Sequence, residues 1–228
     1  PEGEGVMRAL AKIVLILAGL STSHAEDGFQ SIFNGTNLDG WDSVEGAWAV
    51  RDGVIHCTGE MKKKNWLIWR KEQPDDFVLR LEFKFIKGNS GVQVRSLDLG
   101  EHRVRGYQVE VAAQSKMGLW HHSLAPHKSR SHLATAGQKV HIAADGTKTT
   151  EQVAAPSTVQ AAYREGDWNA LEVTAEGPRL IQKINGVVFA DLTDEEKAYA
   201  TRSGFIALQD HGKGTRAAFR NIRLKHLD

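Results

Sequence analysis

The segment at residues 77–85, FVLRLEFKF, most constrains how this chain can fold. Side chains alternate between the two faces of a β-strand, so the five phenylalanines and leucines at odd positions would share one face. Arg80, Glu82 and Lys84 would share the other face. Burying each large apolar side chain contributes roughly 1.5–3 kcal/mol. We therefore expect a strand here that anchors a hydrophobic core.

Similar short segments recur along the chain with turn residues between them. Asp52-Gly53 and Asn185-Gly186 are two-residue hairpin signals. Phe219 and Ile222 are three positions apart, which indicates a β-bulge at Arg220-Asn221. The one helical segment we expect is short and spans residues 194–199. The other strands are expected at residues 48–50, 54–56, 66–69, 92–95, 107–111, 171–175, 179–184, 187–190, 204–209 and 217–227.

Many short strands with almost no amphipathic helix predict an all-β fold. A jelly-roll β-sandwich with a concave polar sheet fits the pattern best. Residues 118–163 differ because they are polar, weakly periodic and rich in histidine. We interpret this region as a long loop and hairpin excursion, with a hairpin formed by 139–142 and 148–153. Its few apolar residues could not form a second core.

The N-terminal residues have the pattern of a secretory signal peptide. Arg8 and Lys12 precede the apolar run 13–20, and small residues at Ser23 and Ala25 suggest cleavage after Ala25. The run is too short to span a bilayer. We expect residues 1–25 to be the leader, with residues 1–6 upstream of a start at Met7. Residues 26–228 would form one exported domain, periplasmic or secreted.

Charge and cysteine content narrow the functional classes. The formal net charge is +1, so no basic excess indicates a nucleic-acid or membrane partner. Cys57 is the single cysteine, which rules out an internal disulfide. The sequence has no nucleophile elbow, phosphate-binding loop or HExxH metal motif. We predict no metal site and no cofactor, while leaving a divalent metal open. The partner expected is a small-molecule or oligosaccharide substrate, with the oligomeric state undetermined.

The stretch Lys87–Val111 contains two strands that could form a sugar-binding surface. Val92 and Val94 would face the core, whereas Gln93 and Arg95 would face away from it. The second strand, 107–111, would place Gln108 and Glu110 on the outer side. In one sheet, these two rows would bring a guanidinium, a carboxylate and two amides together.

An ordered set of motifs across nearly the whole mature chain resembles the 3-keto-disaccharide hydrolase family. The motifs are Ile32–Gly35, Leu38–Trp41, Trp48–Val54, Asp76–Phe83, Asn89–Val92 with Arg95, Gly106–Glu110, Gly166–Asn169, Ile184–Gly186, Leu208–Gly212 and Phe219–Arg223. The resemblance implies a concanavalin-like jelly roll, bacterial export and action on glycosides oxidised at C3. The region 118–163 matches this family poorly.

The implied reaction begins at the C2 hydrogen, which a C3 ketone acidifies. A base removes this proton, the glycosidic oxygen leaves by β-elimination, and water adds. We expect Glu110 or His211 to be the base, and Arg95 to hold the C3 oxygen or sugar hydroxyls. The expected substrate-binding residues are Gln93, Gln108, Asp210, Lys71 and Trp120.

Two other functions are compatible with the sequence. A carbohydrate-binding module of the same fold would bind by aromatic stacking and need no titrating group. An ordinary glycosidase needs a second carboxylate near Glu110, because that reaction uses an acid together with a nucleophile or base. Asp210 is the one candidate that the sequence offers for that second carboxylate.

Overall fold

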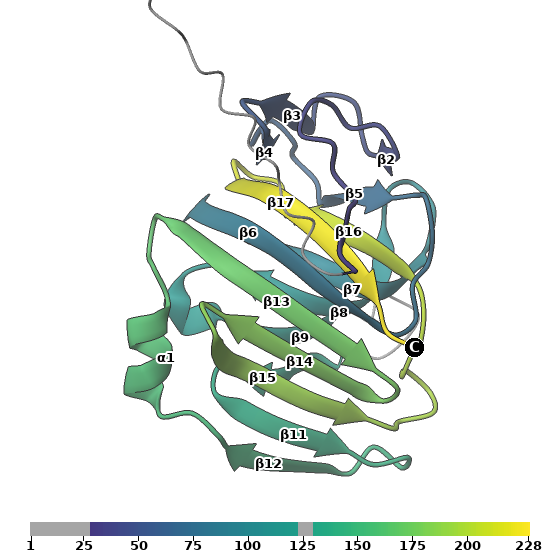
Figure 1. Cartoon of the computed structure of the whole chain (residues 1–228), viewed down its shortest axis with the longest axis vertical. Coiled ribbons are helices and arrows are strands. Elements are labelled where there is room, and N and C mark those ends of the chain that lie inside the picture. The colour runs from purple at the N-terminus through teal and green to yellow at the C-terminus, as the bar shows by residue number, and fades with distance from the viewer. Residues whose placement is uncertain (1–27, 123–129) are drawn as a thin grey trace, which may run out of the picture.

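The computed structural model describes residues 28–122 and 130–228, and it consists of two layered β-sheets (Figure 1). The expected signal peptide, residues 1–25, lies outside the described residues. No helix in the described ranges is both long and apolar enough to cross a membrane.

Within the described ranges, one sheet has ten strands and the other has seven. In spatial order, the ten-stranded sheet contains β12 (Lys148–Gln152), β11 (Gln138–Ile142), β15 (Val187–Asp194), β14 (Arg179–Ile184), β13 (Trp168–Glu176), β6 (Phe77–Lys87), β17 (Arg216–His226), β4 (Val54–Cys57) and β3 (Trp48–Arg51), with β1 (Gln30–Ser31) paired to β17. The seven-stranded sheet contains β10 (Ser131–Thr135), β9 (Gly118–His122), β8 (Val104–Val111), β7 (Ser90–Asp98), β16 (Phe205–Asp210), β5 (Asn65–Trp69) and β2 (Trp41–Asp42).

The predicted alternation positions the core between the sheets. In β6, the five odd-numbered phenylalanines and leucines are buried, and they meet Val92, Val94, Val109 and Val111 of the facing sheet in one cluster. The hairpins at 52–53 and 185–186 form as expected. The β17 bulge is also confirmed, since its register shifts between Arg220 and Arg223. The expected all-β sandwich is therefore confirmed.

The described residues of the region 118–163 form strands of the two sheets and are not a separate excursion. Strands β9 and β10 extend the seven-stranded sheet, and β11 pairs in parallel with β15 at the edge of the other sheet. The expected hairpin forms as β11 and β12. The outermost strand β12 is short and exposed along its whole length, so its sequence has no apolar periodicity.

The helix prediction was wrong. Among the described residues, the α-helix is α1 (Pro156–Ala162), and a short 3₁₀ turn, η1, spans Gln114–Lys116. Proline at the first helical turn and the buried Val159 stabilise α1. The chain at Asp194 instead ends β15 and pairs with Ile142.

Candidate functional site

A pocket of about 460 Å³ hollows the outer face of the seven-stranded sheet. We call it the site pocket. The side chains that line it come from strands β8–β10 and β16 and from adjoining segments. They are Lys64, Asn89, Gln108, Glu110, Lys116, Trp120, His122, His132, Gln209 and His211.

Strand alternation explains why these residues share a face. Val109 and Val111 of β8 enter the core, so Gln108 and Glu110 point outward. Gln108 pairs across the sheet with Trp120 of β9. Gly91 of β7 is required here, because a Cβ at that position would collide with the side chain of Gln108. The glycine lets Gln108 lie across β7 toward β16.

Glu110 is a buried carboxylate whose pKa is raised. Burial raises the pKa above its ordinary value, against hydrogen bonds and a positive charge that lower it. Gln108 Nε2 donates to Glu110 Oε1 at 2.8 Å, and Asn89 Nδ2 donates to Glu110 Oε2 at 3.2 Å. The positive charge is that of Lys64. A carboxyl group with a raised pKa is well suited to proton transfer near neutral pH.

A chain of amides holds the floor of the site pocket. Gln93 Nε2 donates to Gln108 Oε1 at 2.9 Å, and Gln108 Nε2 also approaches Gln209 Oε1 at 3.2 Å. Gln209 Nε2 lies 3.1 Å from Nε2 of His122. With this amide orientation, His122 accepts at Nε2 and its ring is neutral. The chain therefore couples the orientation of Glu110 to that of His122.

The pKa values of His122 and His211 in the site pocket are lowered, so both imidazoles are neutral near pH 7. Burial, then the charge of Lys64, lowers the pKa of His122 to about 3. Burial and the charges of Lys64 and Lys213 lower the pKa of the half-buried His211. The positive charge of Lys64 therefore lowers the pKa of Glu110 and of both imidazoles.

We expect the protein to lose stability as the pH falls below about 6.5. His121 and His122 have native pKa values of about 4 and about 3, so the unfolded state binds protons that the native state excludes. Each of these two histidines should lower the free energy of unfolding by roughly 1–2 kcal/mol between about pH 7 and pH 5. Urea unfolding at both pH values should show a smaller acid loss for His122→Gln. The exposed His141→Gln variant is the control, and an unchanged loss in His122→Gln would contradict the assignment.

Arg95 does not lie on this surface, so that part of the sequence prediction is wrong. Its backbone φ is +48°, and the pairing of β7 with β8 shifts register between Val94 and Leu97. This bulge ends the regular alternation and redirects the side chain. The guanidinium, 1% exposed, donates to Asp75 O at 2.8 Å, Gly177 O at 2.7 Å and Asp76 Oδ1 at 2.6 Å.

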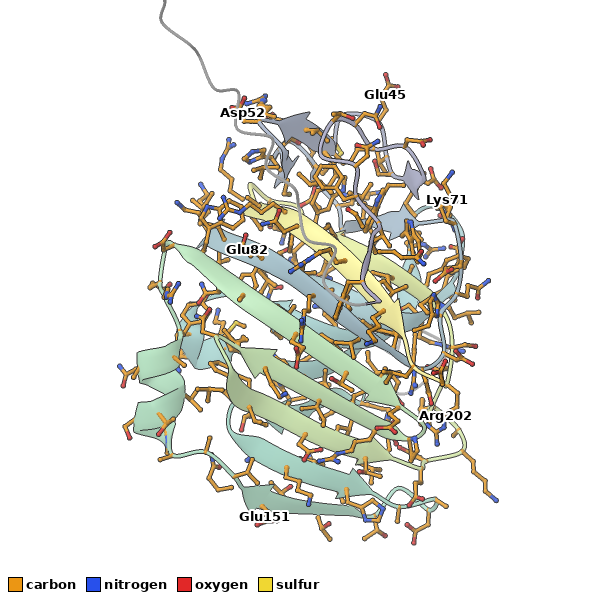
Figure 2. The ribbon with its side chains drawn as sticks, in the orientation of Figure 1. Glu45, Asp52, Lys71, Glu82, Glu151 and Arg202 are labelled. Atoms are coloured by element: carbon orange, nitrogen blue, oxygen red, sulfur yellow. The ribbon has the colours of Figure 1, made fainter. Side chains whose placement is uncertain are left out.

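Three predicted sugar-binding residues also fall outside the lining. Asp210 is fully buried on the opposite side of β16 from Gln209, and it accepts from Asn65 Nδ2 at 3.0 Å and from the Gly212 amide at 2.7 Å. Gln93 is fully buried behind Gln108. Lys71 is exposed at the outer edge of the molecule, as Figure 2 shows. Glu110, His211, Gln108 and Trp120 do line the site pocket.

Sequence reasoning missed several of the lining residues. His122 has the same strand parity as Trp120, so alternation along β9 could have found it. Gln209 could have been found in the same way, because it lies on the side of β16 opposite the core residue Leu208. Lys64 precedes β5 in an irregular segment and Asn89 lies between two strands, so neither has a periodic signal. Among the described residues, no cluster of three His, Cys, Asp or Glu side chains is arranged to hold a metal ion.

Comparison with solved structures places the fold among carbohydrate-related β-sandwiches. A structure described as a putative glycosyl hydrolase from Parabacteroides distasonis ATCC 8503 matches with a TM-score of 0.59 and 20% identity, over 88% of this chain and 94% of that one. The carbohydrate-binding module CBM66 from Bacillus subtilis matches with a TM-score of 0.53 and 15% identity, over 82% and 95%. A Bacillus subtilis protein with a galectin-like fold matches with a TM-score of 0.55 and 13% identity, over 87% of this chain and 94% of that one.

These likenesses show a jelly-roll fold, and in this chain the site pocket lies on one of its two sheets. The 3-keto-alpha-glucoside-1,2-lyase-like domain family matches residues 28–225, and the chain belongs to that family. The resemblance drawn from the sequence motifs is thereby confirmed. A search of curated protein sequences found no significant match.

Proposed function

We propose that this protein cleaves 3-keto-glycosides by C2 deprotonation and β-elimination, followed by addition of water. The observation that carries the proposal is Glu110, a buried carboxylate with a raised pKa beside Lys64 and two neutral imidazoles. Membership of a 3-keto-glucoside lyase-like family supports the same chemistry. Pairing a carboxylate of raised pKa with histidines of lowered pKa is a pattern seen in enzymes that abstract a proton next to a carbonyl.

In the first step, Glu110 takes the C2 proton and becomes a neutral carboxylic acid. The electron pair of the C2–H bond moves toward the C3 carbonyl and forms an enolate. Lys64 supplies the positive charge that stabilises the enolate oxygen. This is the role that the sequence had assigned to Arg95.

In the second step, the enolate collapses and the bond between C1 and the glycosidic oxygen breaks. His211, half-buried at the end of β16, passes a proton from one ring nitrogen to the departing oxygen and regains one from solvent at the other. Water then adds its oxygen to C1 and releases a proton to solvent, while Glu110 returns its proton to C2, which gives the free 3-keto sugar and restores the carboxylate. No oxidant or reductant is consumed.

The remaining pocket residues would bind the sugar. Trp120 is half-buried and presents an aromatic surface on which a pyranose ring can stack. Asn89 Oδ1 is buried without a hydrogen-bond partner, so it would accept from a sugar hydroxyl. Gln108 and Gln209 lie beside it at the pocket floor.

A carbohydrate-binding module is the second candidate, and the likeness to CBM66 with the stacking surface of Trp120 favours it. An ordinary glycosidase is disfavoured because Glu110 is the one carboxylate among the described residues that line the site pocket. The deciding assay uses a 3-keto-glucoside with a chromogenic leaving group and deuterium at C2. Slowed release or washout of deuterium supports elimination, whereas binding of unoxidised glucans without turnover supports the module.

We also propose that the protein is exported to the periplasm or secreted. The motivating observation is the basic, apolar and small-residue order of residues 8–25. N-terminal sequencing of the protein isolated from its native cells should begin at Glu26. A sequence that retains the apolar run would contradict export with cleavage.

A further inference from the structure

A second hollow of about 280 Å³ adjoins the site pocket and shares His132 with it as a common wall. His132 of β10 pairs across the sheet with Trp120 of β9, and their rings meet edge to face at 4.6 Å. A group attached to a sugar stacked on Trp120 would therefore extend past His132 into this hollow. We call the hollow the side pocket.

The base of the side pocket is apolar. Leu133 and Ile142 are 2% and 4% exposed, and the ring of Tyr199 joins them in the lining. Gly146, in the turn between the strands β11 and β12, also lines the side pocket. An aromatic ring would bury apolar surface here, whereas a second sugar would bring several hydroxyls against Leu133 and Ile142.

Two cations, Arg130 and Lys148, and one carboxylate, Glu196, line the side pocket. Arg130 is already used by the fold, because its guanidinium pairs with Asp194 at 2.7 Å and Glu196 at 2.9 Å. Lys148 forms no ion pair with any carboxylate in the described part of the chain. Burial and the charge of Arg130 lower the pKa of Lys148, and the charge of Lys148 in turn contributes to lowering that of His132. An anion placed here would be attracted to Lys148 without displacing an existing partner.

We propose that the side pocket binds a leaving group that combines an aromatic ring with a carboxylate, anchored by Lys148. The proposal rests on the proposed function of the site pocket and specifies its substrate class. The ring would lie on Leu133, Ile142 and Tyr199, and the carboxylate would reach the Lys148 ammonium. The enzyme would then act on 3-keto-glucosides of hydroxybenzoate-like acids.

The test compares two 3-keto-glucosides, one carrying 4-hydroxybenzoate and the other the neutral 4-hydroxybenzamide. Both kcat/KM and the dissociation constant are measured for wild type, Lys148→Gln and the control Lys139→Gln, an exposed lysine on the same hairpin. For each variant, the acid-to-amide ratio is the kcat/KM for the 4-hydroxybenzoate compound divided by that for the 4-hydroxybenzamide compound. The intrinsic reactivities of the two leaving groups cancel when this ratio is compared between variants.

We expect Lys148→Gln to reduce the acid-to-amide ratio about five-fold, and Lys139→Gln to leave it unchanged. The wild-type preference should also shrink as salt is raised, because the ammonium is exposed. Equal ratios in wild type and Lys148→Gln overturn the side-pocket assignment even if both compounds are cleaved. If neither compound is cleaved, the proposed reaction fails, and the ratio of dissociation constants still tests the role of Lys148.

Discussion

Replacing Glu110 by glutamine is expected to lower kcat on a chromogenic 3-keto-glucoside by about 10³-fold, with little change in KM. Glutamine keeps the shape of the side chain and can still accept from Gln108, but it cannot take the C2 proton. The new amide N–H₂ would face Asn89 Nδ2, which donates to Glu110 in the wild-type protein, so the Asn89 amide must turn over to present its unpartnered Oδ1 as the acceptor. The variant should therefore remain folded, and its loss of turnover can be assigned to the missing base.

The same substitution has a second expected signature in stability. Because the native pKa of Glu110 is raised, the native state holds this proton more tightly than the unfolded state does. Stability is therefore lost as the pH rises from the unfolded pKa through the native one. Glu110→Gln removes that loss, so its thermal midpoint should exceed that of wild type at about pH 8 and differ little at about pH 4.

These two measurements separate the alternatives. A fully active Glu110→Gln would eliminate Glu110 as the base and leave His211, the other candidate from the sequence, in that role. His211→Ala tests this directly, since its imidazole lines the same pocket. Unchanged sugar binding in both variants, without turnover in wild type, would favour the carbohydrate-binding module.

Strand alternation predicted much of the fold because it reports burial directly. The even and odd positions of β6 and β8 separate into core and surface as their sequences indicate. The same rule placed Gln108 and Glu110 on one outer face, and it applies equally to Trp120 and His122 of β9. A site residue was predictable where it lies in an uninterrupted strand and alternation gives its side.

The rule fails wherever the backbone departs from regular strand geometry. Arg95 has the same sequence parity as Gln93, but the left-handed conformation at Arg95 turns its side chain out of the polar row. Lys64 lies before β5 in an irregular segment, so its position beside Glu110 depends on tertiary packing. Asp210 has the parity of core residues, and a family motif alone did not show that its carboxylate points inward.

Replacing Arg95 should therefore change the stability of the fold strongly and the rate of turnover little. Arg95→Ala is expected to lower the free energy of unfolding by about 3 kcal/mol. The substitution removes three hydrogen bonds from a side chain that is 1% exposed. The carbonyls of Asp75 and Gly177 would lose these partly buried hydrogen bonds, and Asp76 would lose its cation.

The acceptors belong to the ends of β6 and β13, so Arg95 ties the bulge of β7 in one sheet to two strands of the other. Arg95→Lys keeps the charge but not the three-directional fork, and it should lose part of the same stability. Urea unfolding of both variants, with the exposed Arg51→Ala as control, measures these losses. At a temperature where Arg95→Ala is folded, its kcat should stay within about threefold of wild type. A stable Arg95→Ala that had lost turnover would instead mean that this guanidinium reaches the substrate.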